Sequence, residues 1–217
     1  MHTFQSVFFD LDGTLTDPGV GITKSVAYAL QTFGISPPPL QSLYPFIGPP
    51  LADSFMKYYK MDRDTALAAV EKYREYFSVR GLFENQVYPG IYDMLRSLKY
   101  AGLRLYIATS KPEEFTEQIL SHFGLRRFFD FVSGSTMDSS RVKKGDVIHH
   151  LFQCVPALYT ERCIMVGDRC HDMIGARENG IPAIGVLWGY GSERELTDSG
   201  AGMLAATPSD LLQKLLQ

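Results

Sequence analysis

The sequence of 217 residues predicts an α/β fold: a doubly wound parallel sheet, as in a Rossmann-like core, with an inserted all-helical domain. Two observations support this prediction. From Tyr88 onward, short apolar stretches typical of buried strands alternate with segments of helical periodicity, the pattern of a parallel sheet covered by helices on both faces. The first strand is separated from this region by about 70 residues that show helical periodicity alone.

The predicted core domain comprises residues 1–15 and 88–217. Its first strand covers residues 4–9, a short apolar run that ends at Asp10. Glycines such as Gly102 mark where the later helices stop. The remaining pattern predicts strands over residues 103–109, 128–133, 163–166 and 183–187, and helices over residues 91–101, 113–123, 144–153, 172–179 and 211–216.

The insert, residues 16–87, is predicted to be all-helical, without a strand. Its predicted helices cover residues 22–33, 51–59 and 64–83. A proline-rich loop over residues 36–50 is expected to contain at most one short helical turn. The insert holds seven Lys plus Arg and seven Asp plus Glu, so it offers no excess charge to nucleic acid. The buried face of its last helix is expected to comprise Leu67, Val70, Tyr73 and Phe77.

Composition and charge narrow the classes of partner. Hydrophobic residues make up 45% and charged residues 21%, a normal globular balance. The net charge of -3 and the pI near 5.9 provide no basic field for nucleic acid or anionic membranes. No apolar run approaches the roughly 18 residues of a membrane span, and the N-terminus lacks a signal-peptide pattern. We therefore expect a cytoplasmic monomer or homodimer that acts on a small metabolite and binds neither nucleic acid nor membrane.

Polar residues follow three of the predicted strands at the points where these strands end. Asp10 and Asp12 follow the first strand two positions apart, so an extended chain directs both side chains the same way. Thr109 and Ser110 end the second strand, and Asp168 follows a later one. Ligands of open parallel sheets bind outside the carboxyl ends of the strands, so these groups are expected to converge. Converging carboxylates repel each other unless a cation is present, which favours Mg²⁺.

These motifs resemble the haloacid dehalogenase superfamily of phosphohydrolases. The matching features are FDLDGT at residues 9–14, a hydrophobic strand that ends in Thr109, a lysine before a later helix, and GDRCHD at residues 167–172. VYPGIYDML, IATSKP and the helical insert make the chain similar to the phosphoglycolate phosphatase-like branch, which has a helical cap. The resemblance covers nearly the whole chain. It implies a magnesium-dependent phosphatase that hydrolyses a small phosphate monoester, such as phosphoglycolate, a nucleotide or a sugar phosphate.

The resemblance also implies roles for the acidic residues. Asp10 is expected to be the nucleophile that forms an aspartyl-phosphate. Asp12 is expected to protonate the leaving oxygen and then to activate the hydrolytic water. Mg²⁺ is expected to be held by Asp10, by the main-chain carbonyl of Asp12 and by Asp168. Asp172 is expected in or near the outer shell of the metal.

The phosphoryl group is expected to be bound by a hydroxyl and a lysine. By the same resemblance, Thr109 hydrogen-bonds this group, and Ser110 stands where relatives often have Asn that contacts substrate. Lys144 neutralises the phosphoryl group and Asp10, because phosphoryl transfer depends mainly on positioning and charge neutralisation. The segment that contains this lysine lacks the common Lys-Pro pair. Its register favours Lys144, directly before the helix, and leaves Lys143 as the alternative.

Other functions remain open at this stage. A phosphomutase of the β-phosphoglucomutase type uses the same catalytic residues, and a non-catalytic binding or regulatory protein of this fold is the alternative from a different class. A dehalogenase of the same fold is disfavoured, because its chemistry does not need a carboxylate at position 12, where this sequence has Asp12. A phosphonate hydrolase needs a cap lysine that forms a Schiff base, for which Lys24 is the candidate by position. The loop of residues 46–50 is expected to contribute to the leaving-group pocket.

Overall fold

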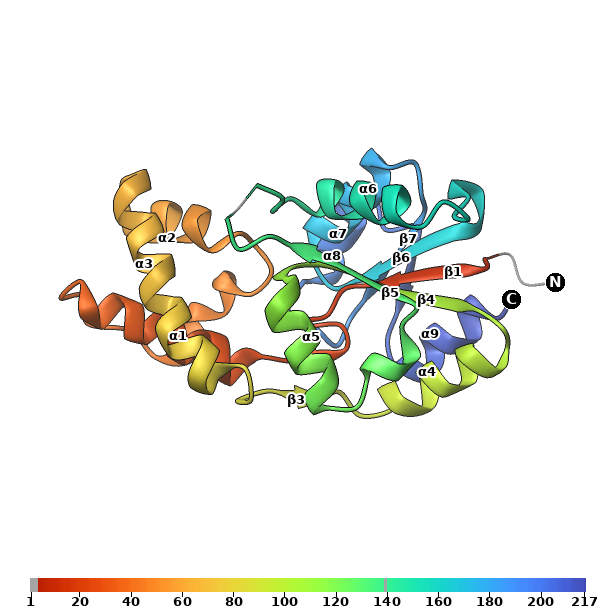
Figure 1. The fold of residues 1–217 in the computed structure, drawn as a ribbon, viewed down its shortest axis with the longest axis horizontal. Coiled ribbons are helices and arrows are strands. Elements are labelled where there is room, and N and C mark those ends of the chain that lie inside the picture. The colour runs from red at the N-terminus through yellow and green to blue at the C-terminus, as the bar shows by residue number, and fades with distance from the viewer. Residues whose placement is uncertain (1–3, 139) are drawn as a thin grey trace. The chain divides into compact units, whose positions relative to one another are not determined.

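A six-stranded parallel sheet organises the larger part of the chain in the computed structural model, which describes residues 4–138 and 140–217 (Figure 1). The strands lie in the order β5-β4-β1-β6-β7-β8, and each neighbouring pair is parallel. The predicted fold class is therefore confirmed. The strands are β1 Ser6–Phe9, β4 Arg104–Pro112, β5 Phe131–Ser135, β6 Cys163–Gly167, β7 Ala183–Val186 and β8 Met203–Ala205.

Helices cover both faces of this sheet (Figure 1). On one face, Phe8 of β1 packs in a cluster with Leu151 of α6 and Met173 of α7. On the other face, the ring of Phe9 lies 6.2 Å from that of Phe129. Strand β1 is thus buried on both sides, which explains its continuous apolar sequence. The helices are α4 Ile91–Tyr100, α5 Glu113–His122, α6 Lys144–Cys154, α7 Cys170–Glu178, α8 Glu193–Asp198 and α9 Pro208–Leu215.

The chain divides into two compact units. One unit runs to Thr16 and resumes at Val87, and the other covers Asp17–Gln86. The boundaries predicted from the sequence follow residues 15 and 87. Where the chain passes from one unit to the other, β2 (Thr16–Asp17) and β3 (Gln86–Val87) pair with each other. The expectation of no strand in residues 16–87 is therefore wrong, because two-residue strands are too short to produce a periodic sequence pattern.

The smaller unit is built from helices α1 Gly19–Thr32, α2 Leu51–Tyr59 and α3 Arg63–Tyr76. A 3₁₀ helix covers Leu40–Phe46, seven residues, where at most one short turn was expected. Its buried residues, Leu43 and Phe46, lie three positions apart, which matches the three residues per turn of a 3₁₀ helix. Helix α3 is continued by a π-helical segment, Phe77–Gly81.

The predicted buried face of α3 is wrong at one position. The side chain of Leu67 is 40% exposed, whereas Val70 and Tyr73 are buried as expected. Small residues account for the difference, because alanines allow a neighbouring helix to approach closely without adding to a pattern of large apolar residues. The face is completed by Ala66 and Ala69.

Several elements of the core differ from their predicted bounds. Strand β5 starts at Phe131 rather than at residue 128, because a 3₁₀ turn occupies Arg126–Phe128. Strand β4 extends to Pro112 instead of ending at Thr109. Helix α8 and strand β8 were not predicted, since six and three residues carry little periodicity. None of the helices described is long and apolar enough to cross a membrane.

Candidate active site

The order of the strands brings three polar segments to the same edge of the sheet. Phe9, the last residue of β1, is level with Ile107 of β4 on one side and with Val166 of β6 on the other. The residues that follow each of these positions therefore leave the sheet together. They include Asp10, Asp12, Thr109, Ser110, Lys111 and Asp168.

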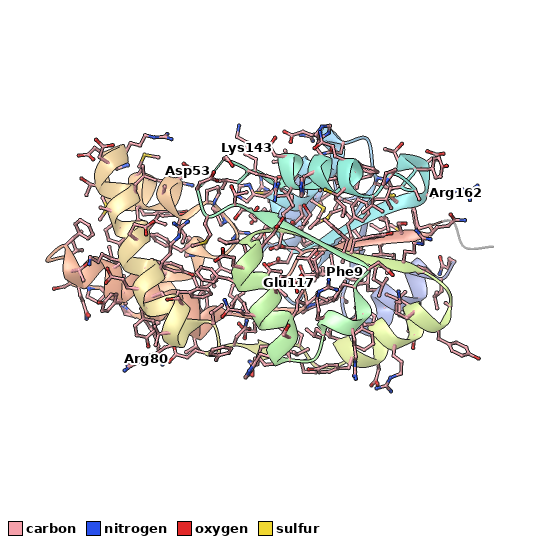
Figure 2. All side chains as sticks on the ribbon, in the orientation of Figure 1. Phe9, Asp53, Arg80, Glu117, Lys143 and Arg162 are labelled. Atoms are coloured by element: carbon pink, nitrogen blue, oxygen red, sulfur yellow. The ribbon has the colours of Figure 1, made fainter. Side chains whose placement is uncertain are left out.

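Lys144, the first residue of α6, joins two of the predicted carboxylates. Its Nζ lies 2.8 Å from Asp10 Oδ1 and 2.8 Å from Asp172 Oδ1, and it donates a hydrogen bond of 2.9 Å to the carbonyl of Ala108. Burial disfavours its charged form, but the two carboxylates outweigh this effect and raise the pKa of Lys144. Lys143 is exposed at the start of α6 (Figure 2), so Lys144 is the lysine that the fold places among the carboxylates.

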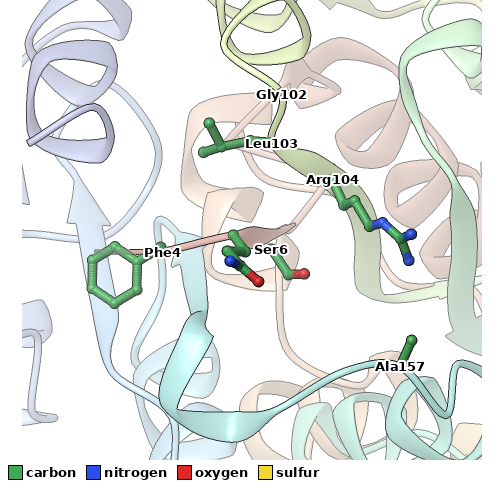
Figure 3. A pocket seen from close by; sticks show the side chains of 7 residues that line it. Phe4, Ser6, Gly102, Leu103, Arg104 and Ala157 are labelled. Carbon is green, nitrogen blue, oxygen red and sulfur yellow. The ribbon is translucent and has the colours of Figure 1, made fainter. Parts of the chain in front are cut away.

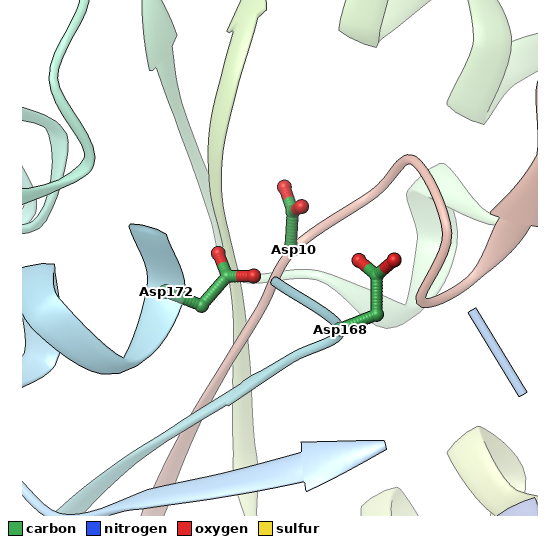
Figure 4. Close-up of side chains that lie close together, drawn as sticks. All are labelled: Asp10, Asp168 and Asp172. Carbon is green, nitrogen blue, oxygen red and sulfur yellow. The ribbon is translucent and has the colours of Figure 1, made fainter. Parts of the chain in front are cut away.

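Asp10, Asp168 and Asp172 form a cluster of buried carboxylates (Figure 4). Each contributes an oxygen atom that lies within 4.8 Å of the others. The orientation of Asp168 is fixed by the hydroxyl of Thr14, at 3.3 Å, and by the backbone N–H of Tyr190, at 2.8 Å. Asp172 Oδ2 accepts a hydrogen bond of 3.0 Å from the N–H of residue 169, which caps helix α7.

Asp12 is bound by a lysine that the sequence analysis did not include in the site. Lys111 Nζ lies 2.6 Å from Asp12 Oδ2, and each residue is only 8% exposed. Burial raises the pKa of Asp12, and Lys111 opposes this shift. The available signal was the spacing, since Thr109 and Lys111 stand two positions apart and point the same way wherever the strand continues past Thr109. Ser110 lies between them and is only half-buried.

The site contains more negative than positive charge. Four buried carboxylates stand against two buried ammonium groups, Lys111 and Lys144, which leaves two negative charges when all are ionised. Burial, followed by repulsion from neighbouring carboxylates, raises the pKa of Asp168 well above its usual value. Buried charges are costly unless they are paired or bind metal. The residues present therefore fit a divalent cation bound by carboxylate oxygens.

A loop after β7 closes around Asp168, and it was also missing from the predicted site. A Cβ atom at Gly189 would lie 2.4 Å from Asp168 Cβ and 2.4 Å from the carbonyl oxygen of Gly13, so no side chain fits there. The indole N–H of Trp188 donates to the carbonyl of Thr14 over 3.0 Å. Two glycines at residues 189 and 191, directly after a predicted strand, were the available signal.

A separate hollow lies at the opposite edge of the sheet (Figure 3). It has a volume of about 390 Å³, and its lining includes Ser6 and Arg104, which begin β1 and β4. Because Asp10 follows the other end of β1, this hollow takes no part in the carboxylate site.

Gly189→Ala is expected to lower the free energy of unfolding by about 1–3 kcal/mol, because the added methyl group overpacks the space beside Asp168. Gly202→Ala is the matched control, since its Cβ would meet its nearest neighbour at 3.6 Å, an ordinary contact. Its effect should stay within about 0.5 kcal/mol. Urea denaturation of both variants gives the measurement. Equal stability of the two variants would show that the loop accommodates the methyl group at residue 189 without a loss of stability.

The chain is similar in sequence to known proteins and in fold to solved structures. The sequence profile of the haloacid dehalogenase-like hydrolase family matches residues 7–186. A 5'-nucleotidase of Pseudomonas aeruginosa is 48% identical over 193 residues, which cover 89% of this chain and 87% of that protein. The tyrosine-protein kinase PtkA of Mycobacterium tuberculosis is 40% identical over 187 residues, which cover 86% of this chain and only 63% of PtkA.

Among solved structures, a predicted phosphatase from Clostridium acetobutylicum has a TM-score of 0.96 and 47% identity, and the match covers 98% of both chains. The family profile and these similarities cover most of the sequence. The chain belongs to the haloacid dehalogenase-like hydrolase family.

Proposed function

We propose that this chain is a Mg²⁺-dependent phosphatase that transfers the phosphoryl group of a small phosphate monoester to Asp10 and then to water. The position of Asp10 carries the proposal. Its carboxylate lies 2.8 Å from the ammonium group of Lys144 and also belongs to the cluster of three carboxylates. An oxygen nucleophile next to both a cation site and an ammonium group suits attack on an anionic phosphoryl group.

The residues that would hold Mg²⁺ are Asp10, the main-chain carbonyl of Asp12, and Asp168, with Asp172 in or near the outer shell. The excess of two negative charges supports this set. When bound, Mg²⁺ neutralises charge on the phosphoryl oxygens.

The protein's own residues supply the remaining steps. Asp10 attacks phosphorus to form the aspartyl-phosphate, while Asp12 gives its proton to the leaving oxygen. Asp12 then takes a proton from the water molecule that attacks the phosphorus, which releases inorganic phosphate and restores Asp10. Lys144 keeps the carboxylate of Asp10 in place, and the hydroxyl of Thr109 donates to a phosphoryl oxygen. Thr109 is buried and directly follows Ala108, whose carbonyl accepts the hydrogen bond from Lys144. This position supports the role of Thr109 in binding the phosphoryl group.

The substrate class is proposed from the relatives and from the smaller unit. The similarity to a protein named 5'-nucleotidase makes nucleoside monophosphates the first class to test, ahead of phosphoglycolate and sugar phosphates. Residues 16–87 are proposed to act as the cap that selects the leaving group. In the loop of residues 46–50, Phe46 and Ile47 are buried and Gly48–Pro50 is half-buried, so Gly48–Pro50 is the more exposed part of the loop.

One observation argues against the phosphonate hydrolase reading. Lys24 Nζ lies 2.6 Å from Glu84 Oε1, and this hydrogen bond raises the pKa of Lys24. A lysine that forms a Schiff base needs the opposite shift, because the neutral amine is the nucleophile. Lys24 therefore serves as a surface ion-pair partner within the smaller unit.

Metal removal tests the proposed function directly. Hydrolysis of a panel of phosphate monoesters should be absent with EDTA, return with Mg²⁺, and be inhibited by Ca²⁺, which accepts more ligands at longer distances and loosens the site. Phosphate release is the measurement, and a bisphosphate-dependent isomerisation without release would indicate a mutase. Full turnover in metal-free buffer is incompatible with the proposal.

Lys144→Met should lower kcat by about 10²- to 10³-fold, since it removes the charge that neutralises Asp10 and the phosphoryl group. Lys143→Met is the matched control, because Lys143 is exposed and precedes the helix. Its kcat should stay within about twofold of the original value. Steady-state kinetics, with circular dichroism to check folding, distinguishes the two. A larger loss of kcat in the Lys143 variant would show that Lys143, and not Lys144, neutralises the phosphoryl group.

Asp10→Asn and Asp12→Asn should have different effects on Mg²⁺ binding and on turnover. Asp10→Asn should abolish turnover and weaken Mg²⁺ binding, because Asp10 is both nucleophile and ligand. Asp12→Asn keeps the main-chain carbonyl, so it should retain Mg²⁺ affinity and lose about 10²- to 10⁴-fold in rate. With p-nitrophenyl phosphate, it should accumulate phosphoenzyme. Rapid-quench kinetics and Mg²⁺ titration provide the data. An equal loss of metal affinity in both variants would show that the two roles are assigned wrongly.

A further inference from the structure

The two oxygen atoms of the Asp12 carboxylate have different surroundings. Oδ2 lies 2.6 Å from the ammonium group of Lys111. Oδ1 is buried and has no hydrogen-bond partner among the described residues. One side of the carboxylate is therefore held by a cation, and the other side is left for a group that none of the described residues provides.

Lys111 belongs to a strand and is buried in this position. It lies in the part of β4 that extends beyond the predicted end of the strand, where the register with β5 shifts between Ala108 and Pro112. The backbone N–H of Lys111 donates to Thr109 Oγ1 over 3.3 Å. With 8% exposure, the lysine is as buried as its partner Asp12. The ammonium group is thus carried to Asp12 by a residue within strand β4.

We propose that Lys111 is a positioning residue that holds Asp12 Oδ2 and thereby assigns both proton transfers of the reaction to Oδ1. This inference rests on the proposed phosphatase function. In the first step, the Oδ1–H bond breaks and its proton goes to the leaving oxygen as the bond from that oxygen to phosphorus breaks. In the second step, Oδ1 takes a proton from the water that forms the new bond to phosphorus, and the bond between phosphorus and Asp10 breaks to release inorganic phosphate.

A contribution to stability does not by itself explain the buried pair of Lys111 and Asp12. Taking two charges out of water is costly, so a buried ion pair often adds no stability over well-packed apolar residues. A carboxylate also turns readily about its last side-chain bond, where the rotational preference is broad. A fixed donor at Oδ2 removes that freedom and keeps Oδ1 directed at the reacting group. Errors of about 1 Å in such placement can cost about 10²-fold in rate.

The dependence of kcat/KM on the leaving group tests this role. This constant covers the steps up to departure of the leaving group, so it reports the first proton transfer and not the second. Lys111→Met, Lys111→Arg and the unaltered protein are compared on p-nitrophenyl phosphate, phenyl phosphate and an alkyl phosphate. Lys99→Met is the matched control, because it removes another lysine–aspartate pair, at 3.0 Å from Asp130, near the start of β4.

For Lys111→Met we expect kcat/KM to fall about 10- to 100-fold on the alkyl phosphate, whose leaving oxygen needs a proton. The fall on p-nitrophenyl phosphate should be less than about threefold, since that leaving group departs without one. Lys111→Arg, which keeps the cation, should recover most of the loss on the alkyl ester. Lys99→Met should leave all three constants unchanged.

An equal loss on all three esters, or no loss, overturns the positioning role of Lys111 while the phosphatase function stands. If the unaltered protein hydrolyses none of them, both proposals fall. Melting temperatures are measured for every variant. If Lys111→Met proves too unstable to assay, Lys111→Gln, which keeps a donor but no charge, is judged by the same dependence on the leaving group.

Discussion

Unpaired negative charge at one edge of the sheet is the constraint on which the rest of the core depends. Four carboxylates are buried there with two lysines, although an apolar cluster of the same volume would be cheaper to bury. Hydrogen bonds from the backbone offset part of this cost. Asp168 and Asp172 each accept from an N–H group of the main chain, and β1, buried on both faces, fixes the point from which Asp10 emerges.

The sequence was sufficient to predict those features that depend on strand ends. In a parallel sheet, carboxyl ends lie at one edge, so Asp10, Thr109 and Asp168 could be brought together without knowing the strand order. Lys144 was predicted from the resemblance to the family, and its register favoured it over Lys143. The structure adds the order itself, with β1 between β4 and β6, which no local pattern contains.

The remaining features depend on contacts between segments far apart in the sequence. Lys111 was not predicted as a site residue, because nothing in the sequence shows that β4 continues to Pro112 or that its register shifts there. The role of Gly189 follows from the close approach of Asp168 and Gly13, 21 and 176 positions away. The exposure of Leu67 has a similar origin, because the buried face of α3 includes Ala66 and Ala69, and a pattern of large apolar residues does not show that helices pack against these alanines.

The hydrogen bond from Trp188 to the carbonyl of Thr14 has a consequence of a different kind. Trp188 is the single tryptophan of the chain, and its partner lies in the same loop as Asp10 and Asp12. The neighbouring Tyr190 N–H contacts Asp168. Indole emission responds to nearby charge and to its own hydrogen bonding, so the protein carries one intrinsic fluorophore, attached to the loop where the proposed chemistry takes place. Ultraviolet fluorescence of the unlabelled chain therefore observes this site without background from any other indole.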